Sequence, residues 1–516
     1  MRYSATRRLD ENERNLVWNH RGVLKSKSKT LPKILKSINW DSVSEVNEVM
    51  AVLDSWPPLE VEEALELFDR NFKNSKVRSF ALKCLKNIQD VDFDHYLPQL
   101  VQALKDEISS LDVANQSNLR KFLFHHASLR YESAHTLFWL LSVEMKQKEE
   151  FFQENDNKQY FSTIRNEFLK VLELGNEIQN SWKTNFQMQD QFMNVLQNNV
   201  DSVMDKKDSQ SEKEMKLQNL LSQFESFEPF PHPLYPDVVI KGIVPTKISL
   251  FSSSNLPLKL TFVTENNQEL KTIFKHTDVR QDQFLLQLFE LMDRLLQKVN
   301  IDLKLTPYKI LAVSTNHGFV EFLESSSIFD ILKIYGSIEN FFKKQNALKI
   351  DQITDNFIRS CAGCSIIGYI LGIEDRHFSN MLLSKEGKLT QIDFNYVFGE
   401  TSTPLPIPIK LTEEMINAMG GLDSKNFKIF QEYCFKAFLE LRKHSNHILN
   451  IMKFMLNSET TVNVNAIAEV EKKFHMELTD QEASEKIQEV IMQSTTAVMP
   501  TLMDLVLKVR NSFNLW

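Results

Sequence analysis

The chain has 516 residues, a length that predicts roughly two to four domains. Its 60 basic and 68 acidic residues give a net charge of −8, which argues against a nucleic-acid-binding protein. A hydrophobic content of 42% excludes extensive disorder, and only four cysteines exclude a disulfide framework. The sequence has no apolar run of bilayer length and no secretory signal, so we expect a cytoplasmic protein that does not insert into a membrane.

The first part of the chain is predicted to form packed amphipathic helices. Two apolar stripes have helical spacing: Val77, Phe80, Ala81, Cys84 and Leu85, then Leu97, Leu100, Val101 and Leu104. Ser75 is a candidate cap for the first of these helices. Helical patterning continues through residues 160–200, so we expect an α-helical solenoid domain.

Two segments then separate this helical part from the rest. The polar run from Asp205 to Glu214 has no apolar anchor, and we interpret it as a solvated loop or a frayed helix end without a special role. Four prolines between Pro229 and Pro236 predict an extended connection.

Beyond the prolines, apolar residues alternate with polar ones, which predicts strands around Ile248 to Leu250, Leu258 to Phe262 and Ile273 to Phe274. A helix is expected from about Gln281 to Val299. The remainder is predicted to be helical except for a hairpin-like piece between Met381 and Tyr396. A small β-rich lobe followed by a larger helical lobe is the order found in kinases. The predicted fold class is therefore α+β.

Two segments contain residues suited to phosphoryl transfer. Lys275 follows a strand and precedes a helix that contains Asp282, so the two can pair and hold the ammonium against a phosphate. Asp375 and Asn380 have the spacing of a kinase catalytic loop, and Asp393 stands where a metal-binding aspartate belongs. Taken singly, each could be an ordinary cap or surface charge. Their common order makes coincidence improbable.

These segments resemble the class III phosphatidylinositol 3-kinases over nearly the whole chain. The order Asp375-Arg376-His377-x-x-Asn380, followed by Asp393-Phe394, is the lipid-kinase order, whereas a protein kinase has His-Arg-Asp. Four further stretches resemble this branch: Leu303 to Tyr308, Tyr335 to Phe342, Cys361 to Cys364 and Pro404 to Leu411.

The resemblance implies a helical accessory domain over residues 1–185, a helical and proline-rich connection over 186–236, a kinase N-lobe over 237–322 and a C-lobe over 323–516. The family's N-terminal C2 domain has no expected counterpart in this sequence. It also implies ATP-dependent phosphorylation of the 3-hydroxyl of phosphatidylinositol, in endosomal trafficking and autophagy.

For the nucleotide, the resemblance implies that Lys275 contacts phosphate, that Asp282 holds Lys275, and that adenine lies against Tyr308. The backbone contacts would come from the lobe connection Glu321, Phe322 and Leu323, and from Ser252 and Ser253 in the loop between two strands. That loop has none of the glycine-rich phosphate-binding motifs, so it is a weak signal by itself.

For the reaction, the resemblance implies that His377 is the base that takes the proton from the inositol hydroxyl, with Asp375 beside it. Asn380 and Asp393 would bind Mg²⁺ or Mn²⁺, and Lys410 would lie in the substrate loop.

For the location, the resemblance implies a peripheral position on endosomal or autophagic membranes. The last helix would contact the membrane through Phe513 and Trp516, although its apolar stripe is equally compatible with packing on the kinase lobe. The implied partners are a pseudokinase-like scaffold subunit and a coiled-coil autophagy subunit.

Three residues depart from the family pattern. Glu374 replaces a glycine, Gln391 replaces a histidine, and Asn395 replaces the glycine after Asp-Phe, where a residue other than glycine is expected to cost about 1 kcal/mol. These changes motivate an alternative hypothesis, a weak or inactive homologue that acts as a scaffold. A protein kinase is a third hypothesis, disfavoured because the proline-rich loop Pro404 to Pro408 offers no obvious peptide platform.

Overall fold

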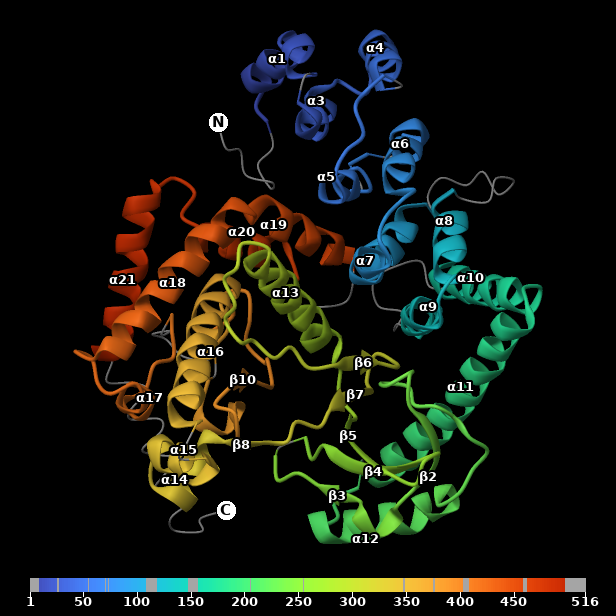
Figure 1. The fold of residues 1–516 in the computed structure, drawn as a ribbon. Helices are drawn as coiled ribbons and strands as arrows, with labels where there is room; N and C mark the ends of the chain where they lie inside the picture. Colours follow the sequence, from blue (N-terminus) through green and yellow to red (C-terminus); the bar gives the residue numbers. More distant parts are fainter. Residues whose placement is uncertain are drawn as a thin grey trace.

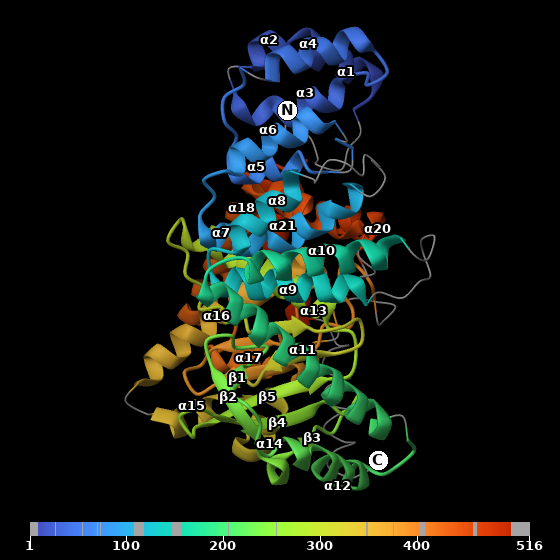
Figure 2. The same ribbon diagram turned by 90° about the vertical axis from the view of Figure 1, so that its right-hand side faces the viewer.

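The computed structural model describes residues 9–496, apart from 26, 54, 70, 73, 108–117, 147–155, 205, 254, 347–348, 375, 402–407 and 458–461. An N-terminal array of helices passes into a β-rich lobe through one long helix, and a second helical lobe then curves back toward the array (Figure 1). From the side, the first helices lie at one end of the molecule and the strands near the other (Figure 2).

The N-terminal array consists of helices, most of which bury one face, whereas the first two, over residues 11–24, contain no buried residue. Its helices are α1 (Glu11–Asn19), α2 (Arg21–Leu24), α3 (Leu31–Ser37), α4 (Val43–Leu53), α5 (Val61–Glu66), α6 (Ser75–Leu85), α7 (Asp90–Ala103), α8 (Asn118–Ala127), α9 (Tyr131–Met145), α10 (Asp156–Glu173) and α11 (Glu177–Met204). The cap expected at Ser75 is wrong by one residue, because the side chain of Asn74 accepts from the Lys76 N–H.

A curled antiparallel sheet forms the β-rich lobe. Its strands are β1 (Phe230–Pro231), β2 (Val239–Ile243), β3 (Ser249–Leu250), β4 (Leu258–Thr264), β5 (Glu269–Lys275), β6 (Ile310–Ala312) and β7 (Gly318–Glu321). The order is β1-β2-β4-β5-β7-β6, and β3 pairs with β4 alone among the described strands. Helix α13 (Arg280–Gln297) follows β5, as the sequence predicts.

The second helical lobe contains a small sheet of β8 (Ser325–Ser327), β9 (Met381–Ser384) and β10 (Leu389–Gln391), in which the predicted hairpin pairs antiparallel. Its helices are α14 (Ile328–Tyr335), α15 (Ile338–Asn346), α16 (Ile350–Leu371), α17 (Glu413–Ala418), α18 (Lys425–Lys443), α19 (Ser445–Phe454), α20 (Val464–Lys473) and α21 (Asp480–Thr496). None of the described helices is long and apolar enough to cross a bilayer.

The predicted fold class is confirmed: a helical region precedes a small β-rich lobe and a larger helical lobe. Helix α11 runs without a break across residue 185, where the sequence suggests a domain boundary. Nearly all of the buried apolar residues in the described part of the chain form one cluster that spans all three parts, from Leu31 to Ile491, and Val143, Val279 and Ala312 form a second, small one.

The interpretation of residues 205–214 as a solvated loop or a frayed helix end is wrong for its second half. Helix α12 (Gln210–Leu221) begins there, with Ser209 as its cap. Ser209 accepts from the Glu212 N–H, and the Glu212 carboxylate accepts from the Ser209 N–H, which satisfies two backbone groups at the helix start. The spacing Ser-x-x-Glu was the sequence signal for this helix.

Helix α13 connects the two helical parts of the molecule. Arg294 pairs with Asp92 of α7, and Gln287 Nε2 donates to the backbone oxygen of His95 at 2.5 Å. Gln99 of α7 donates to Gln287 Oε1 at 3.0 Å. These contacts join the accessory helices to the helix that begins beside Lys275.

The carboxyl group of Asp293, on α13, is buried and only partly hydrogen-bonded, and it supports a pH-dependent prediction. One of its carboxylate oxygens accepts from Gln297 at 2.7 Å, whereas the other is buried without a hydrogen-bond partner among the described residues. Burial, followed by the charge of Asp302, raises the pKa of Asp293 to about 6. The folded protein therefore holds the Asp293 proton more tightly than the unfolded chain, and ionisation above this pKa reduces stability.

We expect Asp293→Asn to raise the free energy of unfolding at pH 7.5 by about 1 kcal/mol after allowance for solvent screening. The gain should shrink as the pH falls from about 6 toward 4, because the wild-type carboxyl then becomes neutral too. Chemical denaturation at several pH values measures it. A gain that does not vary with pH would contradict this explanation.

Candidate active site

Lys275, at the end of β5, is held between two carboxylates from different parts of the chain. Its ammonium lies 2.5 Å from Asp393 Oδ1, after β10, and 3.4 Å from Asp282 Oδ2, in the first turn of α13. The structure therefore brings together three residues that the sequence suggested for phosphoryl transfer. Asp282 is the more buried of the two acids, with a side chain 12% exposed against 40% for Asp393.

The electrostatics of this cluster keep Lys275 protonated. Burial lowers the pKa of Lys275, but the charges of Asp282 and Asp393 outweigh it and leave the pKa raised. Burial raises the pKa of Asp282, and the pairing with Lys275 opposes that change. A permanent ammonium beside a partly exposed carboxylate is suited to binding polyphosphate and a cation together.

Arg376 holds the backbone around Asp393. Its guanidinium donates to the carbonyl oxygens of Glu374 at 2.9 Å, Ile392 at 2.8 Å and Asp393 at 2.6 Å. It also lies 5.1 Å from the ring centroid of Phe394. Asp393 has a left-handed backbone, with φ +54°, which few residues adopt without cost. The planar fork of Arg376 supports this unusual turn.

Arg376→Lys is expected to lower kcat about tenfold, equivalent to about 1.4 kcal/mol, because one ammonium cannot replace three guanidinium bonds. Nucleotide affinity should change much less, since the Lys275 pair remains. Arg359→Lys is the matched control, because Arg359 lies on α16 and pairs with Asp355 far along the chain from this turn. Equal kinetic losses in both variants would contradict a specific role for Arg376.

Gln281 is a residue of the site that the sequence did not reveal. It follows the first residue of α13, and its Nε2 donates to the Phe394 backbone oxygen at 2.8 Å. Gln281 and Arg376 thus hold the Asp393–Phe394 turn from two sides. A glutamine at a helix start is too common to have indicated this contact.

The strain expected at Asn395 is wrong. Asp393, rather than Asn395, has the positive φ in this turn, and Phe398 follows with φ +57°. The side chain of Asn395 is exposed. Replacement of Asn395 by glycine therefore relieves no backbone strain.

Asn380 lies next to Asp393 at the end of the hairpin. It closes a short 3-10 helix, Phe378–Asn380, and its backbone oxygen accepts from the Ile392 N–H at 3.0 Å. Amide and carboxylate oxygens are the donors that Mg²⁺ and Mn²⁺ prefer. Lys275 contacts Oδ1 of Asp393, and Oδ2 makes no hydrogen bond to the described residues. The donor set fits a divalent cation.

The catalytic loop precedes this hairpin. His377 is the residue before the short helix and is half-buried. Lys410 lies 5.9 Å from the ring centroid of Phe378, so it lies beside the segment that contains His377 and Asn380. Asp375 lies outside the described residues, as do Phe513 and Trp516 at the C-terminus.

The expected adenine-binding residues lie just before β6 and at and after the end of β7, the strand that pairs with β5. Tyr308 is buried just before β6, and burial, followed by the charges of Asp282 and Asp393, raises its pKa. Glu321 ends β7, and its carboxylate accepts from the Lys309 N–H at 2.8 Å. The side chain of Glu321 is thus used to hold the neighbouring strand.

The lobe connection continues from Glu321. The ammonium groups of Lys259 and Lys271 both lie near the ring of Phe322, at 5.0 and 5.4 Å from its centroid. The Leu323 backbone oxygen accepts from the Ser325 N–H at 2.8 Å. The connection is therefore stabilised from both the sheet and the following chain.

Ser252 and Ser253 lie in the exposed loop that joins β3 to β4. The N–H groups of Phe251 and Ser253 bond to Pro257 and Phe251 backbone oxygens, each at 2.9 Å. Ser252 reaches Gln210 of α12 at 3.5 Å. In this conformation one of the expected phosphate donors, the Ser253 N–H, bonds within the loop itself.

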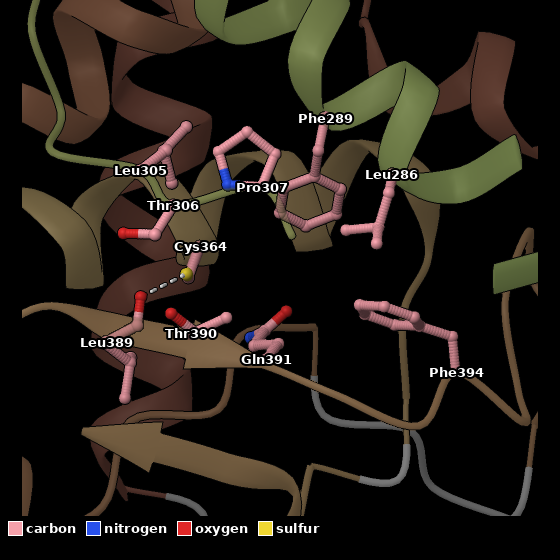
Figure 3. A pocket seen from close by; sticks show the side chains of 10 residues that line it. All are labelled: Leu286, Phe289, Leu305, Thr306, Pro307, Cys364, Leu389, Thr390, Gln391 and Phe394. Atoms are coloured by element: carbon pink, nitrogen blue, oxygen red, sulfur yellow. Dashed lines mark hydrogen bonds between the residues drawn. The ribbon is translucent and has the colours of Figure 1, made fainter. Parts of the chain in front are cut away.

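A small cavity of about 10 Å³ lies behind the Asp393–Phe394 turn (Figure 3). It is lined by Leu286, Phe289, Leu305, Thr306, Pro307, Cys364, Leu389, Thr390, Gln391 and Phe394. Gln391 Oε1 and Thr306 Oγ1 are buried without hydrogen-bond partners among the described residues. The cavity is about the size of one water molecule.

Comparison with known proteins agrees with this geometry. Residues 269–464 match the family described as phosphatidylinositol 3- and 4-kinase, and residues 1–183 match the accessory (PIK) domain of the phosphoinositide 3-kinase family. The first match spans the region from β5 to the start of α20.

Curated relatives extend the similarity over nearly the whole chain. "Phosphatidylinositol 3-kinase, root isoform" of Glycine max is 35% identical over 98% of this chain and 63% of its own length. "Phosphatidylinositol 3-kinase VPS34" is 35% identical in Arabidopsis thaliana, over 98% of this chain and 63% of its own length. The Saccharomyces cerevisiae protein of that name is 32% identical over 97% of this chain and 63% of its own length.

This chain therefore spans about 63% of the length of these relatives. Kinases of this type use ATP and a divalent metal, in agreement with the oxygen donors beside Lys275. The chain therefore matches a phosphoinositide 3-kinase accessory domain and a phosphatidylinositol 3- and 4-kinase catalytic domain, and it is similar to phosphatidylinositol 3-kinases over nearly its whole length.

Proposed function

We propose that the protein transfers the γ-phosphoryl group of ATP to the 3-hydroxyl of phosphatidylinositol, giving phosphatidylinositol 3-phosphate. The observation that carries this proposal is the Lys275 ammonium between Asp282 and Asp393, next to the loop that contains His377 and Asn380. The names of the relatives support phosphatidylinositol as the substrate.

In the proposed reaction, His377 takes the proton of the inositol hydroxyl as its oxygen bonds to the γ-phosphorus. The bond from that phosphorus to the β–γ bridging oxygen breaks, and ADP leaves. Lys275 binds phosphate and neutralises charge in the transition state. Asn380 and Asp393 would hold Mg²⁺ or Mn²⁺, which supplies positive charge to the phosphates.

The proposal extends to location and partners. We place the protein peripherally on endosomal or autophagic membranes, with Phe513 and Trp516 as membrane contacts. The apolar stripe before them in the sequence supports this assignment. A pseudokinase-like scaffold subunit and a coiled-coil subunit are the proposed partners.

Product analysis tests the proposed function. The purified chain is incubated with labelled ATP, Mg²⁺ or Mn²⁺, vesicles containing phosphatidylinositol, and a protein substrate. Label only in phosphatidylinositol 3-phosphate is the expected result. Label only on protein, or only in a multiply phosphorylated lipid, would overturn the assignment. Nucleotide binding without turnover would favour the scaffold hypothesis.

A further inference from the structure

Helix α12 forms hydrogen bonds to the free edge of strand β3. Gln210 Nε2 donates to the Leu250 backbone oxygen at 2.9 Å, and Glu214 Oε1 accepts from the Leu250 N–H at 2.8 Å. Gln218 Nε2 donates to the Ile248 backbone oxygen at 3.1 Å. Among the described strands, β3 pairs only with β4, so these side chains satisfy the edge that no strand covers.

The spacing of these three residues allows all of them to contact β3 at the same time. Gln210, Glu214 and Gln218 are four residues apart and therefore lie on one face of α12. Gln210 Nε2 also lies 3.3 Å from Glu214 Oε1. Together they bind both backbone groups of Leu250, and the carboxylate makes the stronger, charge-assisted bond.

The contact lies at the base of the loop expected to bind phosphate. Leu250 is the last residue of β3, and the loop begins at Phe251. Ser252 Oγ in the loop reaches Gln210 Oε1 at 3.5 Å. A side chain on α12 is thus connected to the loop both directly and through Leu250.

Helix α12 is itself fixed to the accessory helices. The buried Lys213 donates to the backbone oxygen of Met204, the last residue of α11, at 3.0 Å. Leu217 and Leu221 of α12 are completely buried. The path from the accessory array to the loop therefore consists of two packed helices, one side-chain hydrogen bond between them, and four from α12 to β3 and the loop.

We propose that α12 positions the phosphate-binding loop, with Glu214 and Gln210 as positioning residues for ATP. The inference rests on the proposed function in one respect, that Ser252 and Ser253 contact nucleotide phosphates. Without the hydrogen bonds of Gln210 and Glu214 to Leu250, the loop would lose its fixed base and would have to be ordered each time that nucleotide binds.

The test compares Glu214→Ala, Glu214→Gln and the exposed control Asn219→Ala in the full chain. Hydrogen exchange of the nucleotide-free protein and direct binding of an ATP analogue are measured without lipid. In Glu214→Ala we expect the Leu250 amide to exchange roughly tenfold faster and the analogue Kd to rise roughly tenfold, as one charge-assisted bond is lost. Glu214→Gln, which keeps an acceptor, should recover most of both effects.

Kinetics add a second readout. We expect Glu214→Ala to raise KM for ATP with little change in kcat, because the residue lies away from the reacting atoms. Unchanged exchange at Leu250, or faster exchange with unchanged analogue affinity, would overturn the inference. A wild-type chain that fails to phosphorylate phosphatidylinositol would overturn the proposed function alone, since the exchange and binding measurements need no lipid. A wild-type chain that binds no nucleotide would overturn both.

Discussion

Asp393→Asn is expected to reduce phosphoryl transfer by roughly a thousandfold, equivalent to about 4 kcal/mol of transition-state stabilisation. The substitution removes the negative charge that pairs with Lys275 at 2.5 Å and that would hold the divalent cation. Asparagine is a better replacement than alanine because position 393 has a left-handed backbone, which asparagine tolerates and alanine does not. A steady-state assay of the purified variant measures the loss.

The fold should be unaffected by this change. Lys275 keeps its second partner Asp282 at 3.4 Å, so its charge remains paired. Asp351→Asn is a matched control, because Asp351 is exposed in the first turn of α16. Near-normal turnover in Asp393→Asn, with a melting temperature like that of the wild type, would exclude Asp393 from the catalytic machinery.

Arg442→Leu is expected to reduce the free energy of unfolding of the C-lobe by about 3 to 5 kcal/mol. Arg442 is 1% exposed, and its guanidinium donates to the backbone oxygens of Phe474, His475 and Leu478 at 2.8 to 2.9 Å. It also lies 2.5 Å from Asp480. Leucine would leave three carbonyl groups buried without donors. Chemical denaturation and limited proteolysis measure the effect.

A variant of Asp480, the acid that pairs with Arg442, distinguishes the contribution of the ion pair from that of the hydrogen bonds to the carbonyl groups. Asp480 has a side chain 65% exposed, so Asp480→Asn should cost no more than about 1 kcal/mol. If Asp480→Asn destabilises the protein as much as Arg442→Leu does, the ion pair rather than the carbonyl bonds holds this turn. Proteolysis of Arg442→Leu should begin near residues 474–480, where those carbonyls lie.

Periodicity predicted the architecture because it reports burial directly. The stripe from Leu97 to Leu104 is buried in and just after α7, and the alternation at Leu258, Leu260 and Phe262 is the buried face of β4. The kinase order followed from these patterns alone. The spacing of Lys275, Asp282 and Asp393 then placed three charged residues that the fold does bring together.

Polar contacts to the backbone could not be predicted in the same way. Gln210 and Glu214 looked like solvated residues, because a side chain that bonds to a strand edge has the same composition as one that bonds to water. The motif identified Arg376 but not its three carbonyl partners. Asp and Asn both tolerate positive φ, so the sequence could not show that Asp393, rather than Asn395, adopts it.

The contacts of α13 with α7 set a limit on how this chain and its relatives can be recombined. A fragment beginning at β1 would keep Gln287 and Arg294 but would lose Gln99 and Asp92, their partners on α7. In a chimera that joins the accessory helices of one relative to the kinase lobes of another, these contacts between α7 and α13 are lost wherever the two relatives have different residues. Helices α7 and α13 should therefore be inherited, and exchanged, as one unit.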